Sequence, residues 1–268
     1  MGNGATRRKF LRRAGLIGGG AVAGGALAAG GETVLARAYP SRVHPSSAPA
    51  TPADRRHHPE YGDVQITWHA ATDQKLIALT FDDGPRPNWT PMVLDILDDT
   101  QVAATFFLIG QRVLEHADIL RGRMNRHEAG NHTWAHRDLA TLDYGQAREA
   151  IGRAHEAITT VTGQQPRYLR PPYGHLGGST LLAAADFRYQ VALWSLQMIE
   201  SEFTDRPAGL VDYIVTSAHP GAIVLAHDTG APDRLVALQG LPDMIEGLRA
   251  KGFRFVTVSQ LLAQTQKP

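Results

Sequence analysis

Two adjacent carboxylates, Asp82 and Asp83, stand at the end of an apolar run in this chain. The run, residues 76–79, is rich in branched side chains and predicts a buried strand, which Gly84 and Pro85 end abruptly. Neighbouring strand side chains point to opposite faces, but at a strand's end both can line one cleft. Two acids in one cleft repel each other unless a cation or a proton intervenes. The pair therefore indicates metal or proton chemistry, with a solvated turn as the alternative.

Two imidazoles follow four residues apart, at His132 and His136. On a helical turn they would share one face and could grip one metal ion. With an upstream aspartate they form a His-His-carboxylate set, which leaves coordination positions open for water and substrate, as catalytic zinc sites do. One of the two acids could then bind the metal while the other handles a proton. The chain has no cysteine, so any metal must use His, Asp or Glu.

Two more polar side chains come at the ends of expected strands. Arg170 is a permanent cation suited to clamping a carboxylate, or to pairing with any surface acid. It opens the segment Arg-Pro-Pro-Tyr-Gly (170–174), a stiff loop that could aim a backbone N–H at a developing oxyanion. His227 follows the expected strand 222–226, where a lone histidine is more often structural than catalytic. In α/β folds the carboxyl ends of strands are where sites are built.

Strand and helix patterns alternate from about residue 63 onward, which predicts a mainly parallel sheet or barrel. We expect helices with Thr90 and Ser259 as N-caps, and a helix that ends at Gly163. The expected strands cover 64–68, 76–79, 102–109, 168–170, 190–196, 222–226 and 254–258. The expected helices cover 90–99, 111–126, 146–162, 207–218 and 235–251, with one more after Ser259.

The 268 residues are 43% hydrophobic and 20% charged, which suits one sizeable core. A net charge of +1 argues against a broad nucleic-acid surface. The basic start, with Arg7 and Arg8, and the Gly/Ala segment that follows resemble a twin-arginine export signal, which predicts a signal peptide over 1–38. A disordered basic tail and an uncleaved anchor are the alternatives. Residues 39–62 are expected to be a flexible linker, and 63–268 the catalytic domain.

Four of these segments, in this order, resemble the motifs of a known family, the polysaccharide deacetylases of carbohydrate esterase family 4 (the NodB-homology domain). Segments 80–84, 132–136, 170–174 and 225–227 are similar to its first, second, third and fifth motifs. The resemblance covers about residues 74–264. It implies an α/β fold of mainly parallel strands, a distorted (β/α) barrel with fewer than eight regular repeats, and a site at the carboxyl ends of the strands.

The resemblance also implies roles. Asp83, His132 and His136 would bind one divalent metal, usually zinc, with cobalt, manganese and nickel as alternatives. Metal-bound water would lose its proton to Asp82 and attack the acyl carbon of an N-acetyl or O-acetyl group, and His227 would act as the general acid. The remaining roles are orientation of Asp82 by Arg170 and substrate binding by Pro172, Leu225 and Tyr173, the last through its backbone N–H.

The fourth motif departs from the family pattern, which has two aspartates and a tryptophan there. Glu200 stands where the aspartate that tunes the catalytic histidine would be, and Ser201 replaces the tryptophan that walls the site. A longer carboxylate could still reach His227, so Glu200 is counted with the catalytic residues.

The leading interpretation is an exported, monomeric deacetylase of a polysaccharide, either a cell-wall glycan or a chitin-like oligomer. We expect no nucleic-acid partner and no stable membrane insertion once the signal is removed. The altered fourth motif motivates one rival, a catalytically weak carbohydrate-binding protein on the same fold. A second rival is an amidase that acts on a non-sugar acyl amide.

Overall fold

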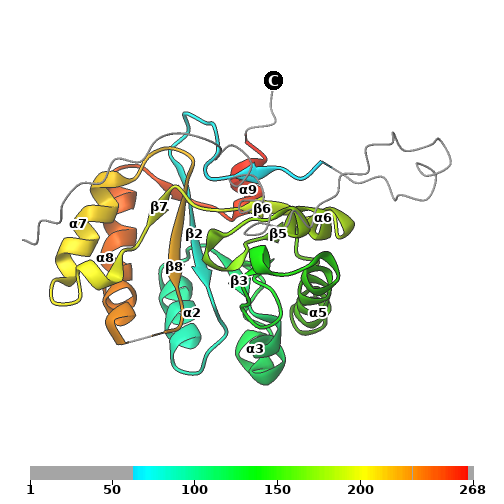
Figure 1. The fold of residues 1–268 in the computed structure, drawn as a ribbon. Helices are drawn as coiled ribbons and strands as arrows, with labels where there is room; N and C mark the ends of the chain where they lie inside the picture. The colour runs from blue at the N-terminus through cyan, green and yellow to red at the C-terminus, as the bar shows by residue number, and fades with distance from the viewer. Residues whose placement is uncertain (1–62, 231, 265–268) are drawn as a thin grey trace, which may run out of the picture. The chain divides into compact units, whose positions relative to one another are not determined.

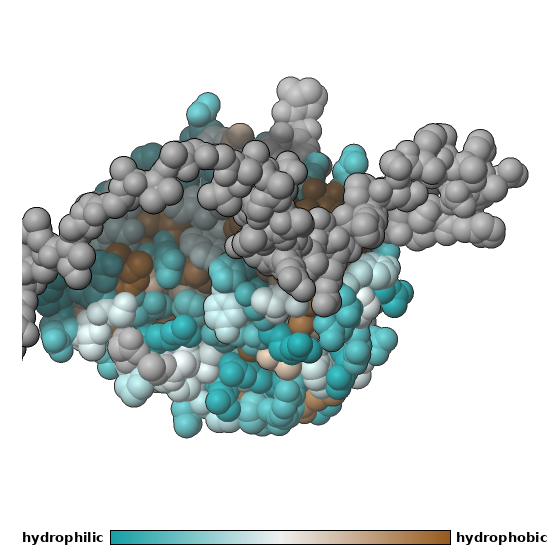
Figure 2. Space-filling view, viewed as in Figure 1, coloured by the Kyte–Doolittle hydropathy of each residue, from teal (hydrophilic) through white to brown (hydrophobic). Residues whose placement is uncertain are grey.

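The computed structural model describes residues 63–230 and 232–264. The predicted export signal (1–38) and linker (39–62) lie outside the described residues, so these boundaries stay predictions. Among the helices of the described part, none has the length and apolarity needed to cross a membrane. In the view of Figure 2, the lower part of the described surface is mainly hydrophilic.

Within the described residues, nine strands form one curled sheet in the order β1-β6-β5-β4-β3-β2-β8-β7, with β9 paired to β2 (Figure 1). Every strand pairing is parallel. An isolated antiparallel bridge joins His69, just after β1, to Ala222 in β8. The expected distorted barrel of mainly parallel strands is thereby confirmed. The strands are β1 Ile66–Thr67, β2 Leu76–Asp82, β3 Thr105–Leu108, β4 Glu128–Asn131, β5 Tyr168–Leu169, β6 Gln190–Ala192, β7 Leu196–Gln197, β8 Ala222–His227 and β9 Arg254–Phe255.

Helices connect the strands, and neighbouring helices pack in pairs, α7 beside α8 and α5 beside α6 (Figure 1). The α-helices are α2 Trp89–Asp99, α3 Gly110–Glu115, α4 Ala117–Leu120, α5 Tyr144–Thr162, α6 Gly178–Asp186, α7 Pro207–Ser217, α8 Leu235–Ala250 and α9 Val258–Leu262. Short 3₁₀ turns are η2 Leu139–Thr141, η3 Pro172–Gly174, η4 Glu200–Glu202 and η5 Pro232–Arg234.

Strand β2 is buried along its whole length, and its side chains alternate between two cores. The outward set packs in the main core against the helices and consists of Ile77, Leu79 and Phe81. The inward set begins with Leu76 and Ala78, which pack in a second cluster with residues of α9. Because the alternation has a period of two, it places Thr80 and Asp82 on the inside of the curled sheet.

Several sequence expectations were wrong in detail. The single helix predicted over 111–126 is two short helices, α3 and α4, because His116 between them leaves helical geometry (φ −131°, ψ 39°). The strand predicted over 190–196 is two strands, β6 and β7. Strand β4 and helix α6 were not predicted as elements. β4 has only four residues, one of them glycine, and α6 is short, with Gly177, which has no capping side chain, at its N-cap.

Two predicted helix caps were also wrong. Helix α2 has Asn88 at its N-cap, and Thr90 instead uses its hydroxyl to donate to Asp228. Helix α9 has Thr257 as its N-cap rather than Ser259. The predicted end of α5 is confirmed, because Gly163 adopts the left-handed conformation (φ 73°) that commonly closes a helix.

Candidate active site

Asp82 and Asp83 line one pocket, as the sequence predicted, because the backbone turns between them. Asp82 is the last residue of β2 and faces the interior. Asp83 has a positive φ of 77°, which breaks the alternation and brings its side chain to the same side. The pocket has a volume of about 360 Å³. Its lining consists of Asp82, Asp83, His132, His136, Pro171, Tyr173, Gly174, Trp194, Gln197, Leu225, His227 and Arg234.

Arg170, directly after β5, is fully buried and holds Asp82 in place. Its Nη1 donates to Asp82 Oδ1 at 2.7 Å and to Thr80 Oγ1 at 2.8 Å. Its Nε and Nη2 donate to the backbone carbonyls of Ala192 and Leu193, each at 2.9 Å. All three guanidinium nitrogens are bonded, so Arg170 is fixed and holds Oδ1 of Asp82 on the interior side. The other oxygen, Oδ2, faces the pocket.

The metal ligands predicted from the sequence come together on one side of the pocket. Asp83 Oδ1 lies 3.4 Å from His132 Nε2 and 3.1 Å from His136 Nε2. The ligand atoms of all three residues lie within 4.8 Å of one another. Donors about 2.1 Å from one ion at tetrahedral angles are about 3.4 Å apart, so these separations fit one small divalent cation.

The helical turn expected for the two histidines was wrong. His132 follows β4, and the segment to His136 is an irregular loop. Thr133 and His136 both have positive φ, 68° and 55°, so the loop folds back on itself. The loop brings both imidazoles to Asp83 without a helical turn.

The donor set fits a metal by its hydrogen bonding as well. The Nδ1 of His132 lies 2.6 Å from the carbonyl oxygen of Arg170, which can only accept, so Nδ1 carries the proton. Its Nε2 lone pair therefore points at Asp83. Asp83 Oδ1 is buried and accepts no hydrogen bond from the described residues. Two imidazole nitrogens and one carboxylate oxygen are a set that zinc, cobalt, manganese and nickel accept.

The electrostatics favour a cation at the same place. Burial raises the pKa of Asp83, but the contacts and charges of His132 and His136 outweigh it and bring the pKa well below its ordinary range. Burial lowers the pKa of His132, yet the charges of Asp82 and Asp83 outweigh it and raise the pKa above its ordinary value. Asp83 thus stays anionic and attracts positive charge to its side of the pocket.

The predicted general acid, His227, stands across the pocket from the ligands. It ends β8 in register with Asp82 at the end of β2. Its Nδ1 lies 3.4 Å from Oε1 of Glu200, which is buried in η4. Asp228, the next residue, turns away and accepts from the Thr90 hydroxyl at 2.6 Å. Glu200, rather than Asp228, is therefore the carboxylate beside the histidine.

The residues predicted to bind substrate lie at the pocket, with one exception. Tyr173 has a positive φ of 62°, and its ring, 62% exposed, lies 4.9 Å from the ring of His136. Leu225 is buried and lines the pocket. The structure places Pro171 in the lining rather than Pro172, which starts the 3₁₀ turn and is buried.

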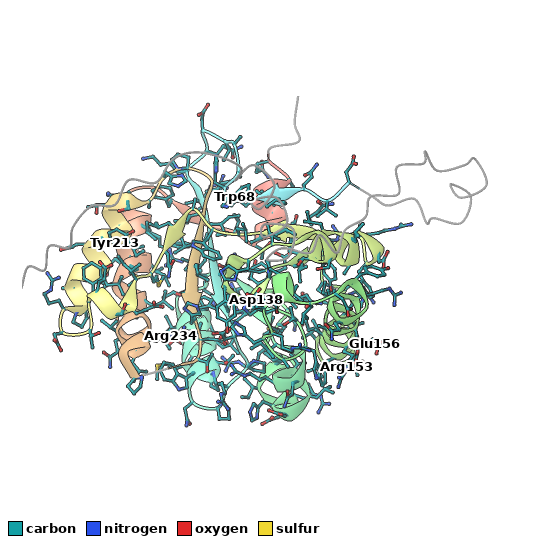
Figure 3. All side chains as sticks on the ribbon, in the orientation of Figure 1. Trp68, Asp138, Arg153, Glu156, Tyr213 and Arg234 are labelled. Atoms are coloured by element: carbon teal, nitrogen blue, oxygen red, sulfur yellow. The ribbon has the colours of Figure 1, made fainter. Side chains whose placement is uncertain are left out.

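Arg234 is a pocket residue that sequence reasoning missed. It comes from the junction of η5 and α8, and Figure 3 labels it. Its Nη1 lies 3.2 Å from Asp83 Oδ2. No motif marks it, because it follows His227 by seven residues in a loop of small residues and proline. Trp194 and Gln197 also line the pocket, and their place in the fourth motif was the available signal.

Comparison with known proteins gives the family. A family model described as polysaccharide deacetylase matches residues 69–192. A peptidoglycan-N-acetylglucosamine deacetylase of Bacillus cereus is 34% identical over 199 residues, which cover 74% of this chain and 92% of that protein. The chain is a polysaccharide deacetylase family member. A chitooligosaccharide deacetylase of a Bradyrhizobium strain is 35% identical over 217 residues, covering 75% of this chain and 94% of the relative.

Solved structures of the family include active and inactive members. The Bc1960 peptidoglycan N-acetylglucosamine deacetylase superposes with a TM-score of 0.69 at 30% identity, covering 75% of this chain and 93% of that one. BA3943 of Bacillus anthracis, a pseudoenzyme of the family, superposes with a TM-score of 0.68 at 27% identity, covering 75% and 69%. Both show the deacetylase fold. Family membership alone therefore leaves activity to be argued from the residues of the site.

Proposed function

We propose that this protein is a metal-dependent hydrolase that removes acetyl groups from an N-acetylated or O-acetylated polysaccharide. The observation that carries the proposal is the joint presence of Asp82, Asp83, His132, His136 and His227 around one pocket. The relatives named as deacetylases of peptidoglycan and chitooligosaccharide point to a cell-wall glycan or a chitin-like oligomer as substrate.

Asp83, His132 and His136 would hold one divalent ion, zinc first among zinc, cobalt, manganese and nickel. When bound, the ion supplies Lewis-acid polarisation of the acyl oxygen and makes a water molecule easier to deprotonate. Arg234, which reaches the second oxygen of Asp83, would keep that carboxylate facing the ion with its first oxygen.

Asp82 acts as the general base. Its Oδ1 is committed to Arg170, so Oδ2 is the oxygen that takes the proton of the attacking water. The backbone N–H of Tyr173 donates to the oxyanion of the tetrahedral intermediate, because Pro171 and Pro172, directly before Tyr173, stiffen that loop at the pocket.

His227 acts as the general acid. Its Nδ1 faces Glu200, so Nε2 is the atom that donates a proton to the departing sugar amine as the bond to the acyl carbon breaks. Leu225, buried at the same strand end, provides the apolar contact for the acetyl methyl group. The products are acetate and the free amine, or the free hydroxyl when an O-acetyl ester is cleaved.

We infer that the protein acts outside the cytoplasm as a monomer. The twin-arginine-like start and the cell-wall relatives support export. Fusing residues 1–62 to a reporter that folds before transport tests the signal. Export should stop when Arg7 and Arg8 are both changed to lysine, and unimpaired export of that pair variant would point to another route.

A carbohydrate-binding protein without useful activity is the second candidate. It is favoured by the altered fourth motif, in which Gln197 and Ser201 replace an aspartate and a tryptophan, and by the structural similarity to a pseudoenzyme. Against it, the base, the ligand set and the acid with its carboxylate all line or adjoin one pocket.

Released acetate decides between these candidates. The zinc-loaded protein is assayed on a panel of acetylated glycans and on a non-sugar N-acetyl amide, with Asp82→Asn as the inactive control. Acetate from a glycan, lost in Asp82→Asn, supports the deacetylase. Glycan binding without acetate supports the binding protein, and acetate from the non-sugar amide alone supports an amidase.

A further inference from the structure

A second pocket opens beside the catalytic one and shares Asp83 with it. Its volume is about 550 Å³. It lies between the loop after β2, the start of α2, helix α3 and the loop after β8. Its lining consists of Asp83, Arg86, Pro87, Trp89, Arg112, Thr229 and Gly230. Arg234 marks the border, because its Nη1 donates both to the carbonyl of Thr229 at 3.1 Å and to Asp83 Oδ2 at 3.2 Å. A glycan whose acetyl group sits at Asp83 therefore has this second pocket at its side.

The second pocket brings two guanidinium groups together. Burial lowers the pKa of Arg112, and the nearby positive charge of Arg86 lowers it further. The negative charges of Asp83, Asp228 and Glu115 also act on Arg112. Among the side chains that the structure describes, no carboxylate lies within 4.0 Å of either guanidinium. The side chain of Arg112 donates to the backbone carbonyl of Asp83, a neutral acceptor. Asp83, the one acid of the lining, is already engaged by the two imidazoles and by Arg234.

Arg112 is half-buried without a carboxylate at contact distance, so a ligand that supplies negative charge would stabilise it, and the exposed Arg86 can reach the same ligand. Two guanidinium groups offer paired N–H donors that match the two oxygens of a carboxylate. Trp89, half-buried in the same lining, adds an aromatic face against which an apolar part of a ligand can pack. The pocket thus combines the recognition of an acid with contact to the carbon skeleton that carries it.

We propose that this pocket binds a carboxylate group carried by the substrate next to its acetylated sugar, so that the enzyme prefers acidic N-acetylated glycans over neutral ones. The proposal rests on the deacetylase function and names the substrate class of that same site. Arg86 and Arg112 supply the donors, and Arg234 at the border repels cationic groups and favours anionic ones.

Arg86 is the arginine whose substitution tests ligand binding without disturbing the metal ligands. Arg112 and Arg234 both contact Asp83, so their loss would also disturb the ligand set. Arg86 is exposed, and its guanidinium makes no hydrogen bond or ion pair with the described residues; only its backbone bonds to Thr90. Arg126 is a matched control, since it is an exposed arginine just ahead of β4, at the opposite ends of the strands.

The test compares kcat/KM for two acetylated oligosaccharides of equal length. One is a neutral oligomer of N-acetylglucosamine, and the other is a peptide-free peptidoglycan strand with a carboxylate on alternate sugars. In the zinc-loaded parent the acidic strand should be preferred. Arg86→Gln should lower the acidic-to-neutral ratio by about 10- to 100-fold, the range for a hydrogen bond to a charged group, and Arg126→Gln should leave it unchanged. Added salt should lower the ratio in the parent.

An unchanged ratio in Arg86→Gln, or an equal fall in Arg126→Gln, overturns the carboxylate pocket while leaving the deacetylase intact. If the parent releases acetate from neither oligosaccharide, the proposed function fails, and the pocket is then judged by binding. In that case calorimetry with the full chain should show tighter binding of the acidic strand, weakened in Arg86→Gln. Equal affinities for the two strands would overturn it.

Discussion

The two sides of the catalytic pocket are built differently. The side that carries the base Asp82 and the three ligands, called here the metal side, is anchored in the protein interior by Arg170, whose buried guanidinium bonds Asp82, Thr80 and two backbone carbonyls. On the acid side, formed by His227 and Glu200, the two side chains lie 3.4 Å apart, and among the described residues no other side chain bonds the imidazole. Substitutions in the Arg170 network should therefore lower the stability of the whole protein, whereas substitutions on the acid side should affect its stability less.

This difference explains where the chain departs from its family. All four motifs that supply the metal side, the base and His227 match the family pattern, and the substitutions fall in the fourth motif. Glutamate is one methylene longer than aspartate, so Glu200 can reach His227 from a backbone position farther back. Ser201, exposed in η4, leaves that wall of the site without the family's tryptophan. The departures from the family pattern thus lie on the acid side, beside an unchanged histidine.

The largest effect is expected from breaking the metal side. His132→Ala removes one of three ligands and leaves Asp83 with one imidazole. Bound zinc, measured by elemental analysis after dialysis, should be lost, and kcat/KM should fall by about 1,000-fold or more, since metal catalysis contributes several kcal/mol. His116→Ala, a histidine between α3 and α4, is the control. Full metal occupancy in His132→Ala would remove this residue from the ligand set.

Arg170 tests whether the metal side is part of the fold. Arg170→Leu leaves Asp82 as a buried charge without its partner, and such a loss costs about 3 to 5 kcal/mol of unfolding free energy. Arg170→Lys keeps the charge but loses the planar fork, so it should be less destabilised. Urea unfolding of the three proteins measures both effects. Wild-type stability in Arg170→Leu would mean that the interior does not depend on this network.

Substitutions on the acid side should lower the rate less than the loss of a metal ligand. Glu200→Gln removes the charge beside His227, so the rate near neutral pH should fall by about 10- to 1,000-fold, the usual size of acid–base contributions. Zinc content should not change.

Two further variants sharpen this prediction. Glu200→Asp restores the family's residue and should keep more activity than Glu200→Gln if the shorter carboxylate still reaches the histidine. Asp228→Asn should leave the rate near neutral pH almost unchanged, because the Asp228 carboxylate bonds Thr90 instead. A rate that falls in Asp228→Asn and stays unchanged in Glu200→Gln would transfer the role to Asp228.

The order of strands and helices could be predicted from the sequence because long elements have clear apolar patterns, a continuous run in β2 and a helical pattern in α5. The loops that make the site could not. Asp83, Thr133, His136 and Tyr173 all have positive φ, and nothing in their side chains requires it. Family motifs identified the side chains, while Arg234 and the second pocket emerge only when separate loops are brought together.

Asp228, which lies behind the pocket, should affect turnover least and the pH dependence of stability most clearly. Burial, with smaller contributions from the charges of Asp83 and Asp82, raises its pKa to about 7, although the Thr90 hydroxyl opposes the shift. Its Oδ1 has no hydrogen-bond partner among the described residues. It also fills the space beside Gly84, where an added Cβ would lie 2.2 Å from Asp228 Oδ2.

The sign of the expected effect follows from proton binding. Between about pH 4 and 7 the folded state holds a proton on Asp228 that the unfolded state has lost, so stability falls as pH rises through this window. An asparagine side chain does not titrate, so the substitution Asp228→Asn removes the fall. In metal-free protein, the unfolding free energy of the wild type relative to Asp228→Asn should decrease by roughly 2 to 3 kcal/mol between about pH 5 and pH 8. Taking the difference cancels groups common to both proteins, such as His127, whose burial lowers its pKa to about 4. Parallel curves for the two proteins would show that Asp228 stays ionised in the folded state across this range.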